Sequence, residues 1–254
     1  MDSPIQIVLP KSLGRLLSLC VSVASVVSQG CLTVQSPHPD VIQEIGSSGH
    51  VASSRAVGSL AMLYPEQARM THRAILTVRG RQFAFDGYVA KAGDNLRLVA
   101  TGAVGLIGEL KWSRNGGAEI IRNGPFFRPA WSKDYMARDL ALLLAPPVKT
   151  LTTGWLSDGR IVLWQAIDRG NGQLRYIFSP DGETLQRIEY WRALCLAYSV
   201  ECLRYRKFPE CPRPIPSEFV VHGESYELHL SVVDLVTTTE PVKTQNPGAV
   251  GNGK

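Results

Sequence analysis

The clearest chemical role in this chain belongs to Cys31, which directly follows a small residue at the end of an apolar segment. Two basic residues precede the apolar run 16–27, and Gly30 stands immediately before the cysteine. This order is typical of a secretory signal, and in bacteria such a thiol receives the acyl chains of a lipoprotein, palmitate among them. The sequence predicts a signal peptide at residues 1–30 and lipidation at Cys31. Ser28 stands where leucine is usual, so the alternative is an ordinary cleaved signal that leaves Cys31 as a thiol.

The later cysteines suit a disulfide better than a metal. Cys195, Cys202 and Cys211 have spacings that match no zinc motif. In an oxidising compartment Cys202 and Cys211 could close a disulfide across the loop that contains Pro209, which would leave Cys195 over.

Catalytic chemistry has no recognisable signature here. The sequence contains no Gly-x-Ser-x-Gly, His-Glu-x-x-His, phosphate loop or Cys-x-x-Cys. His222 and His229 flank a turn and are better interpreted as surface residues than as metal ligands. We therefore expect a protein that is not an enzyme and that needs no cofactor or metal.

The charge of the chain is too small to indicate nucleic acid as a partner. The formal net charge is +5, and the signal segment contributes part of it. Basic residues gather between Arg69 and Arg81 and again between Arg204 and Lys207, without an aromatic-rich nucleic-acid motif. A solvated sheet face is the favoured interpretation, and attraction to anionic lipid head groups is the alternative.

Apolar residues recur mostly with a period of two, which predicts antiparallel strands joined by Gly-, Asn- and Asp-rich turns. One helix interrupts them between Ser132 and the stop at Pro146, with Met136, Leu140 and Leu143 on one face. The expected strands are a hairpin over 73–89, then 96–100, 108–113, 118–123, 160–168, 173–179, 184–191, 194–208, 218–222 and 226–236.

The flanking segments lack this period. Residues 31–59 are rich in Ser, Gly, Pro and His and are predicted to form a flexible tether, with a short helix near 41–45. Residues 238–254 are predicted to be a disordered tail. The folded domain is therefore expected at 60–237.

Several strands carry apolar residues on both faces, as in the run that contains Leu163 and Trp164. Such a sheet must be covered on both sides or must line a cavity. The order of elements predicts a mainly β fold, a curved antiparallel sheet or incomplete β-barrel with a helix over its concave apolar face. Trp164, Met136, Leu140 and Leu143 are the candidates to line a cavity there.

Four ordered features carry a resemblance to a known family. They are the lipoprotein start, the paired strands 73–91 with the segment 96–110 after them, the helix that ends in Leu144-Ala145-Pro146-Pro147, and Pro214-Ile215-Pro216-Ser217-Glu218-Phe219 before the strand 226–235. Together they resemble the LolB-like bacterial outer-membrane lipoproteins, especially their uncharacterised relatives. The resemblance implies an incomplete β-barrel whose cavity binds acyl chains.

The resemblance also implies a function and partners. It predicts a monomer, anchored by lipid in the periplasmic leaflet of the outer membrane, that binds acyl chains or a lipoprotein cargo and inserts it there, with a periplasmic carrier as a further partner. The Pro-Leu-Gly element of LolB aligns with Ala103-Val104-Gly105, so Val104, Leu106 and Ile107 are the expected insertion loop. The alternative is a structural envelope lipoprotein that binds another envelope protein.

Overall fold

Thirteen strands form one antiparallel sheet in the part of the chain described by the computed structural model, residues 41–42, 47–103, 105–124, 137–146, 151–167, 172–192 and 195–237. These residues belong to one unit, Asp40–Lys254. The strands are β1 (Val41–Ile42), β2 (Gln67–Val78), β3 (Arg81–Ala92), β4 (Asn95–Gly102), β5 (Gly105–Ser113), β6 (Gly117–Asn123), β7 (Thr152–Leu156), β8 (Ile161–Ile167), β9 (Gly172–Phe178), β10 (Leu185–Arg192), β11 (Cys195–Arg206), β12 (Ile215–His222) and β13 (Tyr226–Thr237).

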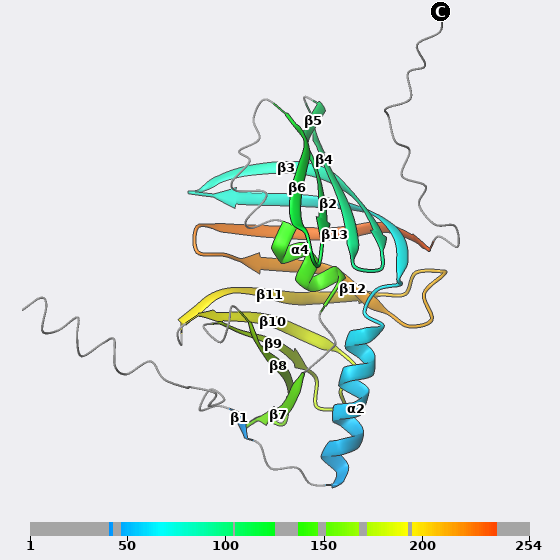
Figure 1. The fold of residues 1–254 in the computed structure, drawn as a ribbon, viewed down its shortest axis with the longest axis vertical. Helices are drawn as coiled ribbons and strands as arrows, with labels where there is room; N and C mark the ends of the chain where they lie inside the picture. Colours follow the sequence, from blue (N-terminus) through cyan, green and yellow to red (C-terminus); the bar gives the residue numbers. More distant parts are fainter. Residues whose placement is uncertain are drawn as a thin grey trace, which may run out of the picture. The chain divides into compact units, whose positions relative to one another are not determined.

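The strand order places the last strand, β13, beside the second strand, β2, in the middle of the sheet. From edge to edge the order is β1-β7-β8-β9-β10-β11-β12-β13-β2-β3-β4-β5-β6. The last strand, β13, pairs with β2 over most of its length. The edges β1 and β6 do not pair with each other, so the sheet stays open. This confirms the predicted incomplete barrel (Figure 1).

Alternation of buried and exposed residues explains why these segments are strands. In β2 the buried side chains Ala68, Met70, His72, Ala74 and Leu76 alternate with exposed ones. One face of the strand therefore faces the core and the other faces solvent, as the period of two predicts.

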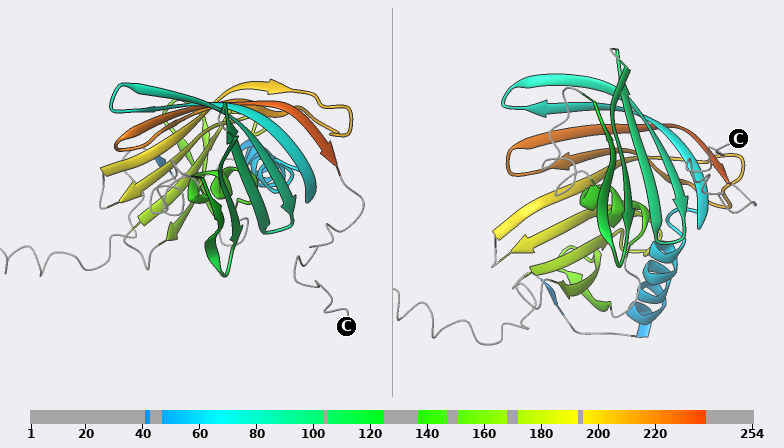
Figure 2. Two further views of the ribbon diagram at one scale, coloured as in Figure 1. Left: turned by 90° about the horizontal axis from the view of Figure 1, so that it is seen from above. Right: turned by 45° about the horizontal axis from the view of Figure 1, so that its top comes forward.

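Two helices lie on the concave side of the sheet, as Figure 2 shows: α2 (Ser47–Ala61) and α4 (Ala137–Leu144). Helix α2 packs against β8 and β10, and α4 packs against β5. Side chains from both helices join one large buried cluster with the inward residues of the strands. The predicted helix over a concave apolar face is confirmed. Its predicted first residues, from Ser132 to Met136, lie outside the described residues.

Helix α2 corrects the predicted tether. Residues 47–59 are helical, and Ala56 and Leu60 are fully buried. The buried side also includes Ser53 and Ser59, so the helix presents small residues to the sheet and shows little apolar period in the sequence. Helix α2 therefore belongs to the ordered body, which was predicted to begin only at residue 60.

Smaller differences concern short elements. Val41–Ile42 pairs with β7 as a strand, where a short helix was expected. Strand β7 was not predicted, because Thr152, Thr153 and Gly154 give it little apolar pattern. The tail 238–254 lies outside the described residues.

Candidate functional site

The concave face of the sheet carries the main apolar surface of the protein. Buried side chains reach it from both ends of the strand order, for example Leu98 and Leu110 on β4 and β5, and Tyr176 and Ile188 on β9 and β10. The inward-facing residues of almost every strand are apolar, so this face is the candidate region for holding an apolar ligand.

Helix α4 occupies this face in the structure. Leu140 and Leu143, two of the predicted cavity-lining residues, are 5% and 3% exposed and belong to the main buried cluster. Ala137, Ala141 and Leu144 complete the buried side at spacings of three and four residues. The helix therefore fills space that an apolar ligand would use. Met136 lies outside the described residues.

The C-terminal end of α4 is held by Arg114, in the turn between β5 and β6. Its guanidinium donates two hydrogen bonds of 2.8 and 2.7 Å to the carboxylate of Asp94 in the β3–β4 turn. It also donates a hydrogen bond of 3.0 Å to the carbonyl oxygen of Ala145. This carbonyl is one of the helix-end acceptors that lack an intrahelical donor. The hydrogen bonds to Asp94 raise the pKa of Arg114, so the contact keeps its positive charge.

A second contact reaches α4 from the other half of the sheet. The hydroxyl of Tyr176 on β9 donates a long hydrogen bond of 3.4 Å to the carbonyl oxygen of Leu142. Burial raises the pKa of this phenol, which remains neutral and acts as a donor. Strands β5 and β9 are far apart in the sheet, so α4 spans the concavity and is tied at its C-terminal end to both sides.

Helix α2 closes the concavity near β8 and β10 and approaches the β9–β10 turn very closely. A Cβ added to Gly182 in that turn would come within 2.2 Å of the carbonyl oxygen of Ala52. Arg55 pairs with Glu183 at 3.5 Å on the exposed side of the same contact. At its C-terminal end, the hydroxyl of Tyr64 donates a hydrogen bond of 2.8 Å to the carbonyl oxygen of Pro216.

A buried histidine interrupts the apolar concave face. His72 on β2 is 5% exposed, and its imidazole covers Gly87 on β3, where an added Cβ would lie 1.9 Å from Nε2. Desolvation lowers the pKa of His72 to about 4, although the nearby charge of Asp86 opposes this shift. The residue is therefore neutral at physiological pH. Sequence reasoning missed it, because a single histidine in a strand is no signal of burial.

The predicted insertion loop lies at the β4–β5 hairpin. Leu106 pairs with Thr101, and Ile107 is the extra residue of a β-bulge next to that pair. Both are half-buried, and Ile107 packs against the main cluster with its Cδ1 close to Gly102. Ile107 is therefore the member of the predicted loop that packs on the folded body, whereas Val104 is the first candidate for the protruding residue and Leu106 the second. Val104 lies outside the described residues, so its exposure remains a prediction.

Trp164 is placed away from the other predicted cavity residues. On β8, Ile161 and Leu163 join the main cluster, whereas Val162 and Trp164 form a separate cluster with Ile177. Alternate residues of a strand point to opposite faces, so Trp164 does not share the face that Leu140 and Leu143 contact. The sequence showed that both faces of this strand are apolar, but not which one the helices cover.

The three later cysteines are free thiols in the structure, so the disulfide predicted between Cys202 and Cys211 is not formed there. Cys195 is exposed, whereas Cys211 is buried and Cys202 packs against the same cluster. Burial raises the pKa of Cys202 to about 12 and also raises that of Cys211. The thiolate, the reactive form, is therefore disfavoured at both inner positions.

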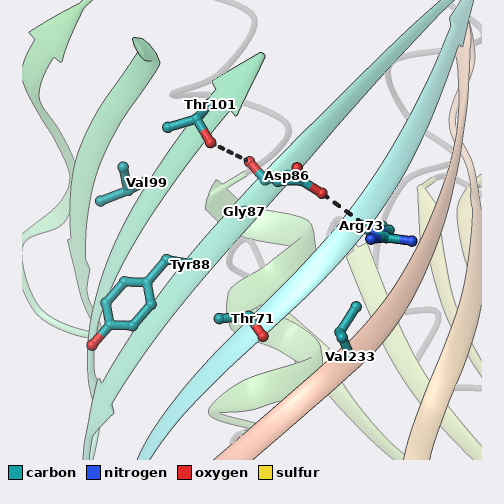
Figure 3. Close-up of a pocket in the computed structure, with 8 residues that line it drawn as sticks. All are labelled: Thr71, Arg73, Asp86, Gly87, Tyr88, Val99, Thr101 and Val233. Carbon is teal, nitrogen blue, oxygen red and sulfur yellow. Dashed lines mark hydrogen bonds and ion pairs between the residues drawn. The ribbon is translucent and has the colours of Figure 1, made fainter. Parts of the chain in front are cut away.

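A shallow pocket of about 360 Å³ lies on the convex face, over β13, β2, β3 and β4. Figure 3 shows Asp86 between Arg73, which it pairs with at 3.7 Å, and Thr101. Both members of this ion pair are well exposed, so the pocket is wet and open. It is separated from the concave face by the sheet itself.

No cluster of catalytic character emerges from the described residues. Among them, no group of three or more His, Cys, Asp or Glu side chains is arranged to hold a metal ion. His222 and His229 do meet, through the carboxylate of Glu227 at 3.3 and 2.8 Å, and all three are nearly half exposed. Neither described helix has the length and apolar character needed to cross a membrane.

Comparison with solved structures gives a fold likeness at very low identity. A LolA superfamily protein from Nitrosomonas europaea superposes with a TM-score of 0.51 at 10% identity, over 74% of this chain and 94% of that one. The described unit has the LolA-like fold. A DUF1329 family protein from Desulfovibrio piger reaches 0.49 at 11% identity, over 76% and 94% of the two chains. A domain named for outer membrane lipoprotein sorting, from Vibrio parahaemolyticus, reaches 0.47 at 9% identity, over 78% and 96%.

The sequence itself has no match among protein-family models or curated proteins. The LolA-like fold therefore rests on the arrangement of strands and helices. At 10% identity it establishes architecture, and function has to be argued from the residues of this chain.

Proposed function

We propose that this protein is a lipid-anchored envelope protein that binds acyl chains, or a cargo carrying them, on its concave apolar face and delivers it at the outer membrane. The observation that carries the proposal is the concave face itself, apolar along nearly all its strands and covered by a short amphipathic helix. Each methylene of an acyl chain buried there contributes about 0.8 kcal/mol, so several together give a reversible grip.

Helix α4 is the element that would have to move. Its buried side is made of Ala and Leu, whose contacts an acyl chain can replace with little cost in apolar burial. Its C-terminal end depends on Arg114 and on the long hydrogen bond from Tyr176. We infer that α4 is a plug that is displaced when cargo enters.

The packed interior favours a second candidate function. Leu140, Leu143 and Leu144 already fill the concavity, as expected for a structural envelope lipoprotein that binds another envelope protein and holds no ligand. The two proposals differ in one measurable property: whether the purified protein carries or takes up an apolar molecule.

Native mass spectrometry of the protein purified without its lipid anchor from bacterial envelope extract tests the first proposal. We expect extra mass from bound acyl ligand, which disappears on washing with detergent. A chain that comes off empty, under conditions in which a known acyl carrier keeps its ligand, would favour the structural alternative.

The delivery step is tested at the β4–β5 hairpin. We propose that Val104 and Leu106 contact the receiving membrane, and that changing both to Glu abolishes cargo transfer to vesicles while cargo binding remains. Leu203→Glu is the matched control, because Leu203 is apolar and 55% exposed on β11, far from this hairpin. Equal transfer by the hairpin variant and the wild type would remove this assignment.

The anchor is proposed at Cys31. Growth with a labelled fatty acid should label the wild-type protein and leave Cys31→Ala unlabelled. Leu32 follows the cysteine in place of the Asp that holds lipoproteins at the inner membrane in enteric bacteria, which supports an outer-membrane location. Label that persists in Cys31→Ala would move the modification to another residue.

A further inference from the structure

The β2–β3 hairpin extends beyond its neighbour β4. The last pair between β3 and β4 is Asp86 with Thr101, whereas β2 and β3 remain paired to the turn, ending with Val78 and Arg81. On its other side the hairpin is supported by β13, which pairs with β2 as far as Tyr226. Residues 75–84, here called the β2–β3 tip, therefore project past β4 and leave this end of β3 as a free edge, while β13 flanks β2 on the other side (Figure 1).

Both faces of the β2–β3 tip carry a large exposed apolar side chain. Phe83 is 52% exposed and lies opposite Leu76, on the face that continues into the core. Ile75 is 45% exposed on the opposite face, paired with Ala84. A protein partner docked on one face would leave the other apolar residue in water. An environment that surrounds the tip covers both.

The charges of the tip are positive. Arg79 and Arg81 flank Gly80 in the turn and are exposed, and the chain has no acidic residue between Gln67 and Phe85. Within the part of the chain that the structure describes, neither arginine forms an ion pair. The carboxylate nearest in register on β13 is Glu227, opposite Thr77, and it is engaged by two histidines.

The turn holds one of these charges in an unfavourable backbone conformation. Arg79 has φ of 50° and Gly80 has φ of 74°, the two positive values of a type I′ turn. Asn, Asp or Gly is preferred at the first of these positions, and a longer side chain is disfavoured there. Arg79 therefore does not stabilise the turn, which points to a function of this side chain outside the turn.

We propose that the β2–β3 tip inserts into the interface of an anionic bilayer, with Phe83 and Ile75 at the boundary of head groups and acyl chains and with Arg79 and Arg81 on lipid phosphates. Aromatic and apolar side chains beside basic ones are the usual composition of an interfacial contact. This contact adds a membrane surface to the proposed delivery role and does not depend on any cargo.

The test uses the full-length protein in vesicles with a polarity-sensitive fluorophore on the tip. Gln82→Cys accepts the label in a background with Cys20, Cys31 and Cys195 changed to Ser, because Cys195 is the exposed thiol among the described cysteines and Cys202 and Cys211 are shielded by burial. With vesicles of phosphatidylcholine and phosphatidylglycerol, we expect the emission of the label to shift to shorter wavelength. We also expect quenchers attached to the lipids to reduce its fluorescence. A label at Asn115, in the β5–β6 turn at the other end of the sheet, should not respond.

Arg79→Asn with Arg81→Gln removes both charges and places a favoured residue in the turn, so folding is preserved. We expect the ratio of inserted to free tip to fall about 30-fold, the order of effect of two basic residues at an anionic surface. Phe83→Thr should also lower it, and Lys111→Gln, an exposed charge elsewhere, should not. Unchanged insertion in the arginine variant would overturn the proposal.

Two further outcomes would overturn it. In the first, the emission of the label on the unaltered tip is the same with anionic vesicles as in buffer. In the second, the emission changes only when envelope proteins are added, which would make the tip a protein-docking surface. Cargo retention by the arginine variant, followed by native mass spectrometry, keeps this test separate from that of acyl binding. A chain without cargo can still insert its tip.

Discussion

At the scale of single residues, the unusual group is a neutral imidazole within an apolar face. His72 is buried between β13 and β3, against Val232 on one side and Gly87 on the other. The missing side chain of Gly87 is what makes room for the ring, since an added Cβ would overlap it. Burial penalises only the protonated form, so the histidine is tolerated as long as it stays neutral.

This predicts a pH dependence of stability. The pKa of His72 is lowered from 6.5 to about 4, so the unfolded chain takes up a proton near pH 6.5 and the folded chain does so only near pH 4. The stability that depends on neutral His72 is fully present above pH 6.5 and is lost as the pH falls towards 4, by about 1.4 kcal/mol per pH unit. Urea unfolding at pH 7, 5.5 and 4.5 measures it.

Replacing the residue provides the comparison. His72→Gln should flatten this part of the pH profile. Equal slopes for wild type and His72→Gln between pH 6.5 and 4 would show that the imidazole is solvated in the folded protein.

At the scale of elements, the strands with a clear alternation were predictable, whereas β1, β7 and helix α2 were not. Alternation in β2 and in the strands after it reflects one buried face, which a sequence displays directly. The buried side of α2 uses Ser53, Ala56 and Ser59, and only its end adds Leu60. Its stability comes from close approach to the β9–β10 turn, a tertiary contact that local pattern does not encode.

The close approach makes Gly182 critical. Gly182→Ala puts a methyl group against the backbone of Ala52 and into a positive φ of 75°, so we expect a loss of roughly 2–4 kcal/mol in unfolding free energy. Gly159→Ala is the matched control, because Gly159 has a φ of 84° but no atom near its added Cβ. It should cost only about 1–2 kcal/mol.

Denaturant unfolding measures the loss of stability in both variants, and hydrogen exchange of residues 47–61 shows whether α2 is loosened. Equal losses in the two variants would mean that α2 shifts away from the turn at no cost and that its contact contributes nothing to stability. A larger loss in Gly182→Ala, with faster exchange in α2, would establish this helix as part of the folded body.

At the scale of the whole molecule, the sequence predicted that a helix packs on an apolar concave face, but not which hydrogen bonds hold the helix there. Leu140 and Leu143 were found from their period, because helix faces are visible in sequence. The contact of Arg114 with Asp94 and Ala145 joins two turns and the end of one helix, which are distant in sequence, so no spacing of residues predicts it. Trp164 shows the same limit, since two apolar faces of one strand look alike.

If α4 is a displaceable plug, then Arg114→Gln together with Asp94→Asn should free its C-terminal end, speed hydrogen exchange in 141–146, and raise the uptake rate of a fluorescent fatty acid by about tenfold. Arg160→Gln with Asp158→Asn is the matched control. That pair is 2.8 Å long, its side chains are 35% and 51% exposed, and it lies within one turn instead of holding α4. The side chains of Arg114 and Asp94 are 35% and 57% exposed.

Unchanged uptake in the Arg114 variant, despite faster exchange in the helix, would mean that the leucines alone keep the concavity closed. The filled interior would then be the functional state, and the structural role would replace the carrier role.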